Sequence, residues 1–175
     1  MKLYHFSEES NITRFEPRQL DYRKDEPAMI WTIDDFHAPH YFLPRDCPRV
    51  CVWPKEDTSE EDLHQFFGHS STNRLVAIET GWYETVKNTQ LYQYTFNSDA
   101  FTLYNRDAGY YITKQPVIPL AVEPLDDLLA AMIALGIELR VTPSLIPLRN
   151  SILNSTVNFS MIRMRNIKEE KEHHE

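Results

Sequence analysis

The stretch TQLYQYTFNSDAFTLYNRDAGYYITKQPVIPLAV, residues 89–122, contains four short strand-like segments and no helical segment between them. The first, residues 89–96, alternates apolar and polar side chains, which is typical of a strand with one face in water. The others are short runs separated by turn residues: 100–104, 109–114 and 116–122. Successive strands without crossover helices favour antiparallel pairing. This stretch therefore predicts an antiparallel sheet.

The segments on both sides of this stretch predict further strands and a few helices. Apolar and aromatic runs indicate strands at residues 2–6, 12–15, 28–33, 48–53, 74–79, 137–142 and 156–165. Helical patterns occupy residues 60–67, 123–136 and 143–153, with a short helix after Asp34. Because strands and helices do not alternate regularly, the sequence predicts an α+β fold with mainly antiparallel sheets.

Two helix boundaries carry specific signals. Thr58 and Glu61 have the spacing of a capping box before the helix at 60–67. The helix at 123–136 is expected to start at its proline, with acidic residues in its first turn, and to stop at Gly136.

Length and composition indicate a single globular domain. The chain has 175 residues and is 42% hydrophobic, enough to bury a core, and it contains no internal repeat or Gly/Ser linker. We expect one domain at residues 1–166 and a charged, disordered tail at residues 167–175.

The charge balance and the apolar runs exclude several classes of partner. With 26 acidic and 18 basic residues, the formal charge of −8 disfavours an extended nucleic-acid surface, although a local basic pocket remains compatible with it. No apolar run approaches the roughly 20 residues of a membrane span, and the N-terminus lacks the apolar core of a signal peptide. A cytoplasmic protein without a membrane partner is expected.

The stretch HAPHYFLPRDCPR, residues 37–49, supports more than one interpretation. His37, His40, Cys47 and Cys51 are ligand types of a structural zinc site, but their spacing lacks a tight Cys-x2-Cys pair. Cys51 lies between valines in a predicted strand, which favours a small buried side chain. No metal is expected, and zinc remains the alternative.

The arginines of the same stretch suggest two other interpretations. Arg45 and Arg49 flank Cys47 and would stabilise its thiolate if it were a nucleophile. Together with Arg18 they would instead form an anion pocket, because guanidinium groups match phosphate oxygens. Pairing of each arginine with a nearby acid is the structural alternative.

The first strand contributes one further candidate. Alternation places His5 on the same face as Leu3 and Ser7. If that face lines a cleft, His5 can hydrogen-bond a ligand hydroxyl; if it faces the core, it is a buried structural histidine. Aromatic residues make up 12% of the chain and often line ligand clefts, and Tyr41 is the one expected to be exposed.

Several segments carry a family resemblance: LYHFS, FEPR, IWTIDDFHAPHYFLPRDCPR, GYYITKQPVIPL and PSLIPLRNSILNSTVNFSMIRMRN. Together they resemble an uncharacterised bacterial family of unknown function. The layout is also similar to ADP-ribosyltransferase-like proteins and RNA 2′-phosphotransferases.

The second resemblance implies particular residue roles. His5 would bind the ribose of NAD or of an ADP-ribosyl group, Tyr41 would stack on nicotinamide or a base, and Tyr110 or Tyr111 would lie near the usual catalytic glutamate. The segment GYYITKQP offers only Gln115 there, which leaves Glu79 or Glu123 as substitutes.

The prediction is a pocket for NAD, ADP-ribose or a related phosphate-bearing nucleotide. Its binding residues are His5, Ser7, Arg18, Arg45 and Arg49. If the protein is an enzyme, a transferase attacking the ribose anomeric carbon, His5, Tyr41 and Tyr110 serve catalysis. The alternatives are a non-catalytic interaction module and a structural zinc protein.

Overall fold

A computed structural model describes residues 1–167, which form two compact units. Unit 1 contains residues 1–42 and 90–126, and unit 2 contains residues 43–89 and the chain from residue 127 onward. The chain passes from one unit to the other three times, after Phe42, Thr89 and Asp126. Neither unit is one continuous segment, so no linker in the sequence marks a boundary between them. Of the predicted tail, only Ile167 is among the described residues.

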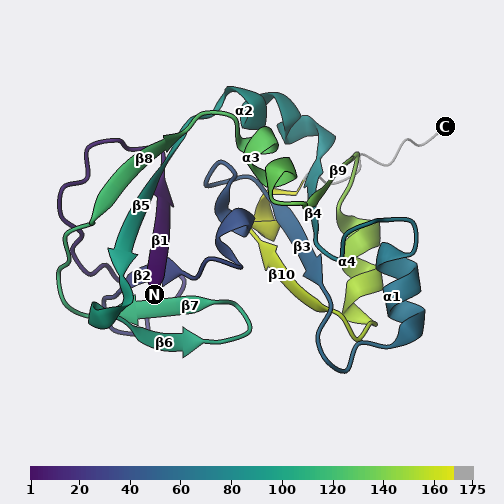
Figure 1. Cartoon of the computed structure of the whole chain (residues 1–175), viewed down its shortest axis with the longest axis horizontal. Helices are drawn as coiled ribbons and strands as arrows, with labels where there is room; N and C mark the ends of the chain where they lie inside the picture. The colour runs from purple at the N-terminus through teal and green to yellow at the C-terminus, as the bar shows by residue number, and fades with distance from the viewer. Residues whose placement is uncertain (168–175) are drawn as a thin grey trace. The chain divides into compact units, whose positions relative to one another are not determined.

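Unit 1 is built on one six-stranded antiparallel sheet (Figure 1). The strand order is β6-β7-β2-β1-β5-β8, so the first strand of the chain lies in the interior of the sheet. Every neighbouring pair is antiparallel, as the run of strands predicts. The strands are β1 (Lys2–Ser7), β2 (Ile30–Ile33), β5 (Leu91–Asn97), β6 (Thr102–Asn105), β7 (Tyr110–Thr113) and β8 (Ala121–Leu125), and the short 3-10 helices are η1 (Ala38–Tyr41) and η3 (Ser98–Ala100).

One face of this sheet carries the core of unit 1. We call it the core face; its buried residues are Leu3, Phe15, Ile30, Tyr94, Phe96 and Phe101. The register pairs Leu3 with Phe96 and His5 with Tyr94, so alternate residues of β1 share this face. The segment expected as a strand at residues 12–15 forms only an isolated bridge from Phe15 to Val117. The Phe15 ring packs over the core face, so this position requires a large apolar side chain although it lies outside the strands.

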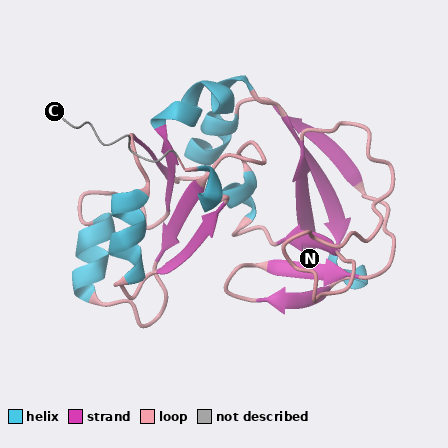
Figure 2. Cartoon of the chain, turned by 180° about the vertical axis from the view of Figure 1, so that it is seen from behind, coloured by secondary structure: helices cyan, strands magenta, loops and turns pink. Residues whose placement is uncertain are grey.

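Unit 2 contains a four-stranded mixed sheet of order β10-β3-β4-β9. Only β4 and β9 are parallel. Helices α1 and α4 lie side by side (Figure 2), and their apolar side chains join the strands in one core. The elements are β3 (Arg49–Trp53), β4 (Leu75–Glu79), β9 (Glu138–Thr142), β10 (Asn158–Ile162), α1 (Glu60–Phe67), α2 (Tyr83–Asn88), α3 (Leu128–Ala134), α4 (Ile146–Leu153), η2 (Thr80–Trp82) and η4 (Met164–Asn166).

The predicted capping box of α1 is wrong by one residue. Ser59 is the N-cap, and its hydroxyl accepts a hydrogen bond from the backbone N–H of Asp62 at 3.2 Å. The Thr58 hydroxyl instead donates to the carbonyl oxygen of Thr156 at 3.1 Å. The Thr58 side chain, which the local spacing assigned to the helix cap, is therefore hydrogen-bonded to a distant segment of the chain.

The start of α3 also differs from the prediction. Asp127 is the N-cap and accepts from the backbone N–H of Ala130 at 2.9 Å, so the helix begins four residues after Pro124. Pro124 lies in the edge strand β8, where a missing N–H is tolerated. The sequence also missed α2, a short helix that follows η2 directly. None of the helices within residues 1–167 has the length and apolar character that a membrane crossing requires.

Candidate functional site

Four partly exposed aromatic side chains cluster on the face of the unit 1 sheet opposite the core face. We call this group, Trp31, Tyr41, Tyr104 and Tyr110, the aromatic face. The Trp31 ring centroid lies 4.7 Å from that of Tyr104 and 5.8 Å from that of Tyr110, both in edge-on contact. The Tyr41 and Tyr110 hydroxyls are hydrogen-bonded to each other. The structure thus brings together the two predicted tyrosines, Tyr41 and Tyr110.

The strand register and one tight turn create this cluster. β2 pairs with β7 so that Trp31 lies opposite Ile112 and Ile33 lies opposite Tyr110, which puts Trp31 and Tyr110 on the same face of the sheet. Asp34 follows the last residue of β2, and the turn after it leads into η1, the predicted short helix. Tyr41 is the last residue of η1.

A cation borders the aromatic face. The Arg23 guanidinium carbon lies 4.9 Å from the Trp31 ring centroid, within cation–π range, and Arg23 donates a 2.8 Å hydrogen bond to the Tyr104 hydroxyl. Glu26 also contacts Arg23, at 3.4 Å. The hydrogen bond from Tyr104 to Glu26 and, second, burial raise the pKa of Tyr104, so this phenol stays protonated at neutral pH.

A carboxylate–imidazole pair lies next to the tyrosines. Asp34 Oδ1 accepts from the Nδ1 of His37 at 2.7 Å and from its backbone N–H at 2.9 Å. Because a carboxylate oxygen accepts, the His37 proton resides on Nδ1. His37 is only 7% exposed, and a Cβ on Gly109 would lie 2.2 Å from its Nδ1. Asp34 was missed as a site residue; its signal is the Asp-x-x-His spacing around a turn.

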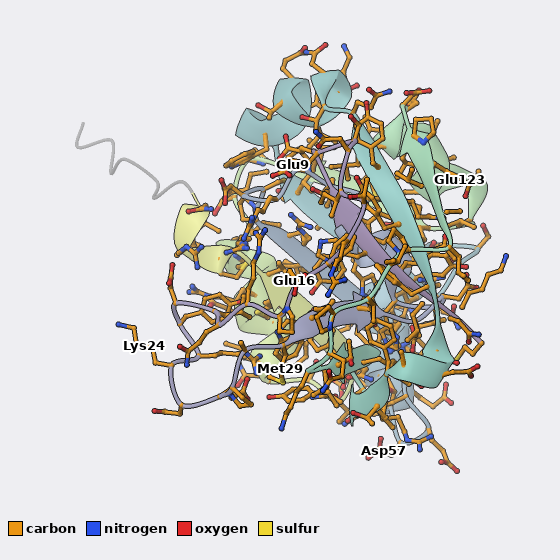
Figure 3. The ribbon with its side chains drawn as sticks, turned by 90° about the vertical axis from the view of Figure 1, so that its left-hand side faces the viewer. Glu9, Glu16, Lys24, Met29, Asp57 and Glu123 are labelled. Carbon is orange, nitrogen blue, oxygen red and sulfur yellow. The ribbon has the colours of Figure 1, made fainter. Side chains whose placement is uncertain are left out.

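Two further carboxylates lie near the same side of the sheet. Tyr4 is on the face opposite the core face, and burial, together with the charge of Asp35 and a hydrogen bond to it, raises the pKa of Tyr4. Gln93 pairs with both Phe6 and Glu123, so Glu123 also belongs to this face. Figure 3 shows Glu123 on the edge strand β8. Of the two predicted substitutes for a catalytic glutamate, it is the one that solvent reaches.

The other substitute, Glu79, is fully buried in unit 2. Its carboxylate accepts a 3.2 Å hydrogen bond from the backbone N–H of Leu145. This contact joins the end of β4 to the start of α4 and gives Glu79 a structural role.

His5 and Ser7 lie on the core face and not on the aromatic face. The His5 Nδ1 donates to the carbonyl oxygen of Trp31 at 3.1 Å, and its ring packs edge-on against Phe15 at 5.1 Å. The Ser7 hydroxyl accepts from the backbone N–H of Glu9 at 3.1 Å. The structure therefore separates His5 from Tyr110, because strand alternation gives them opposite faces.

The three predicted phosphate-binding arginines do not share one environment. Arg18 is exposed in unit 1, where its backbone forms a bridge with Met29. Arg45 is exposed in unit 2.

Arg49, the third of these arginines, is only 1% exposed. Its guanidinium donates to the carbonyl oxygens of Pro44 at 2.6 Å and Cys47 at 2.7 Å. These contacts hold the turn before β3 in shape, with backbone carbonyl oxygens as the acceptors where the sequence suggests a nearby acid.

Neither cysteine has the environment of a nucleophile. Both are fully buried, and burial raises the pKa of Cys47 to about 11 and that of Cys51 to about 12. Arg49 lowers both values only in part, so the thiols stay protonated at neutral pH. Within residues 1–167, no three His, Cys, Asp or Glu side chains are grouped closely enough to hold a metal ion.

Comparison with known proteins places the chain in a family. A family of unknown function, DUF6886, matches residues 4–167. The chain belongs to this family. No curated protein and no solved structure matches the chain. Membership of DUF6886 covers both units and assigns no activity, so the function has to be argued from the site.

Proposed function

We propose that this DUF6886 protein binds a nucleotide, with NAD or ADP-ribose as the candidate, on the aromatic face of unit 1. The proposal rests on one observation: the hydroxyls of Tyr41 and Tyr110 are hydrogen-bonded to each other, and the Tyr110 ring lies beside the Trp31 ring. Partly exposed rings offer a stacking surface for a base or for nicotinamide, and phenol hydroxyls can bond a carboxamide or a ribose.

The charges around the aromatic face fit the same ligand. Arg23 supplies a cation for a diphosphate at one side, next to Trp31. Glu123 supplies a carboxylate on the same face of the sheet, at the strand that forms the opposite edge. A carboxylate at this position can orient ribose hydroxyls. The ADP-ribosyltransferase resemblance implies an acidic residue with this role.

If NAD is also a substrate, the reaction is transfer of its ADP-ribosyl group. The bond from the ribose anomeric carbon to the nicotinamide nitrogen breaks, and nicotinamide leaves with the electron pair. A bond forms from an acceptor oxygen to the same carbon, and the proton of the acceptor passes to Glu123. This step is balanced without a redox change.

Calorimetric titration with ADP-ribose and with NAD tests the proposal. Tyr110→Phe removes one hydroxyl, and we expect affinity to fall about 2- to 10-fold, the range of one hydrogen bond. Tyr92→Phe is the matched control, because it removes a phenol hydroxyl that bonds Gln90 elsewhere in the same unit. Affinity should be unchanged in the control.

Two results would contradict the proposal. The first is no saturable binding of either nucleotide at millimolar concentration, which would favour the interaction module. The second is an equal loss of affinity in both tyrosine variants. Nicotinamide release from NAD, measured with the parent protein and with Glu123→Gln, separates a binding protein from a transferase.

A further inference from the structure

The turn before β3 and the segment of η4 meet in unit 2, and both segments contain arginines. Arg163 Nε donates to the carbonyl oxygen of Arg45 at 3.2 Å, and Asn166 Nδ2 donates to that of Asp46 at 2.7 Å. These bonds join segments about 120 residues apart and hold the backbone of Arg45 next to the side chain of Arg163. No local sequence signal connects the two segments.

A hollow of about 570 Å³ opens at this junction. Its lining residues are Asp46, Trp82, Arg165, Asn166 and Ile167. Arg45 and Arg165 are exposed, and within residues 1–167 neither side chain forms an ion pair or hydrogen bond. The lining thus contains one guanidinium group, that of Arg165, and one carboxylate, that of Asp46, while Arg45 and Arg163 belong to the two segments that meet beside it.

Two features of the junction are energetically unfavourable: a strained backbone conformation at Arg163 and an unpaired buried N–H at Trp82. Arg163 has φ 57°, the only left-handed non-glycine residue in the described part of the chain. Such backbone strain persists where surrounding contacts fix it and is concentrated at functional sites. The Trp82 indole N–H is buried and has no acceptor among residues 1–167, which is unusual for a buried donor.

We propose that this hollow, which we call the arginine hollow, binds the phosphate group of a small molecule. Arg165 lies in its lining, and Arg45 and Arg163 lie on the two segments that meet beside it. Guanidinium groups form forked hydrogen bonds to phosphate oxygens, so Arg165 is the principal phosphate ligand of this site. Trp82 also lines the hollow, and its indole N–H is the further donor that the proposal assigns to the ligand.

The arginine hollow is neither the phosphate pocket predicted from Arg18, Arg45 and Arg49 nor the nucleotide site proposed on the aromatic face. Of the arginines predicted to bind phosphate, Arg45 is the one that directly precedes a lining residue of the arginine hollow, Asp46. The site lies within unit 2, whereas the aromatic face lies within unit 1. Either proposal can fail without the other.

The test is calorimetric titration at constant ionic strength with inorganic phosphate, pyrophosphate and ribose 5-phosphate. We expect Arg165→Gln to weaken binding about 10- to 100-fold, and Arg165→Lys to retain more affinity because it keeps the charge. Arg149→Gln is the matched control: it removes the same charge from α4 in the same unit, where Arg149 contacts Asn150. Stronger binding of ribose 5-phosphate than of phosphate identifies an esterified ligand.

Fluorescence gives a second measurement that does not depend on charge. A phosphate-induced change in emission should be absent in Trp82→Phe. Tyr110→Phe should bind phosphate normally, which separates this site from the aromatic face. The proposal is overturned if no phosphate compound binds saturably at tens of millimolar, or if Arg149→Gln and Arg165→Gln lose affinity equally.

Discussion

At the scale of the residue, Gly109 shows how closely the surroundings of the aromatic face are packed. It has φ 72°, and an added Cβ would lie 2.2 Å from the His37 Nδ1 and 2.8 Å from the Asp34 Oδ1. Its backbone carbonyl accepts the N–H of Asp34 at 3.0 Å. Both the backbone conformation and the space are therefore needed for the Asp34–His37 pair to form beside Tyr110.

Gly136 is the matched control for Gly109, because it also has φ 72° but no atom lies within 4 Å of its added Cβ. We expect Gly136→Ala to lower the free energy of unfolding by about 1–2 kcal/mol, the cost of the left-handed conformation. Gly109→Ala should cost about 1–3 kcal/mol more, because it adds a clash. Denaturant unfolding measures both. Equal losses would show that the residues around Gly109 can move away.

At the scale of the element, Asp62 connects α1 to the segment before β10. Its Oδ2 accepts from the Thr156 backbone N–H at 2.7 Å and from the Thr156 hydroxyl. The hydrogen bond from that hydroxyl, then the one from the backbone N–H, hold the pKa of Asp62 below its usual value. The amphipathic pattern of residues 60–67 predicted the helix, but it gave no information about this partner.

The depressed pKa predicts a pH dependence. Because Asp62 is a better acceptor when ionised, its contribution to stability is present above the pKa of an unfolded aspartate and is lost as pH falls through the lower folded value. We expect Asp62→Asn to be less stable than the parent protein at pH 7, and the difference to shrink below about pH 4. Glu61→Gln, on the exposed side of the same turn, should show no such trend in thermal unfolding.

At the scale of the whole molecule, the chain forms two units that are interleaved in sequence. Residues 1–42 and 90–126 share one antiparallel sheet, because β5 pairs with β1 along the full length of β1. Each unit has its own buried apolar cluster. The two proposed sites are therefore carried by different units and can be examined separately.

Hydrogen exchange measured by mass spectrometry locates each ligand. ADP-ribose should slow exchange at residues 30–41 and 104–111 of unit 1, and phosphate should slow exchange at residues 45–46 and 163–167 of unit 2. Each ligand should leave the segment of the other unchanged, because its contacts lie within one unit. Protection of the same segments by both ligands would show that they share a site.

The sequence by itself determined the α+β class, the antiparallel character of residues 89–122 and most strands, because alternation and turn residues act over a few neighbours. The resemblance to ADP-ribosyltransferase-like proteins pointed to Tyr41 and to Tyr110 or Tyr111, and the hydroxyls of Tyr41 and Tyr110 are hydrogen-bonded to each other. Only the tertiary structure decided that His5 lies on the other face, that Arg49 is buried, and that Arg45 lies beside Arg163. Strand register and contacts between distant segments set these positions, and local side-chain patterns do not contain that information.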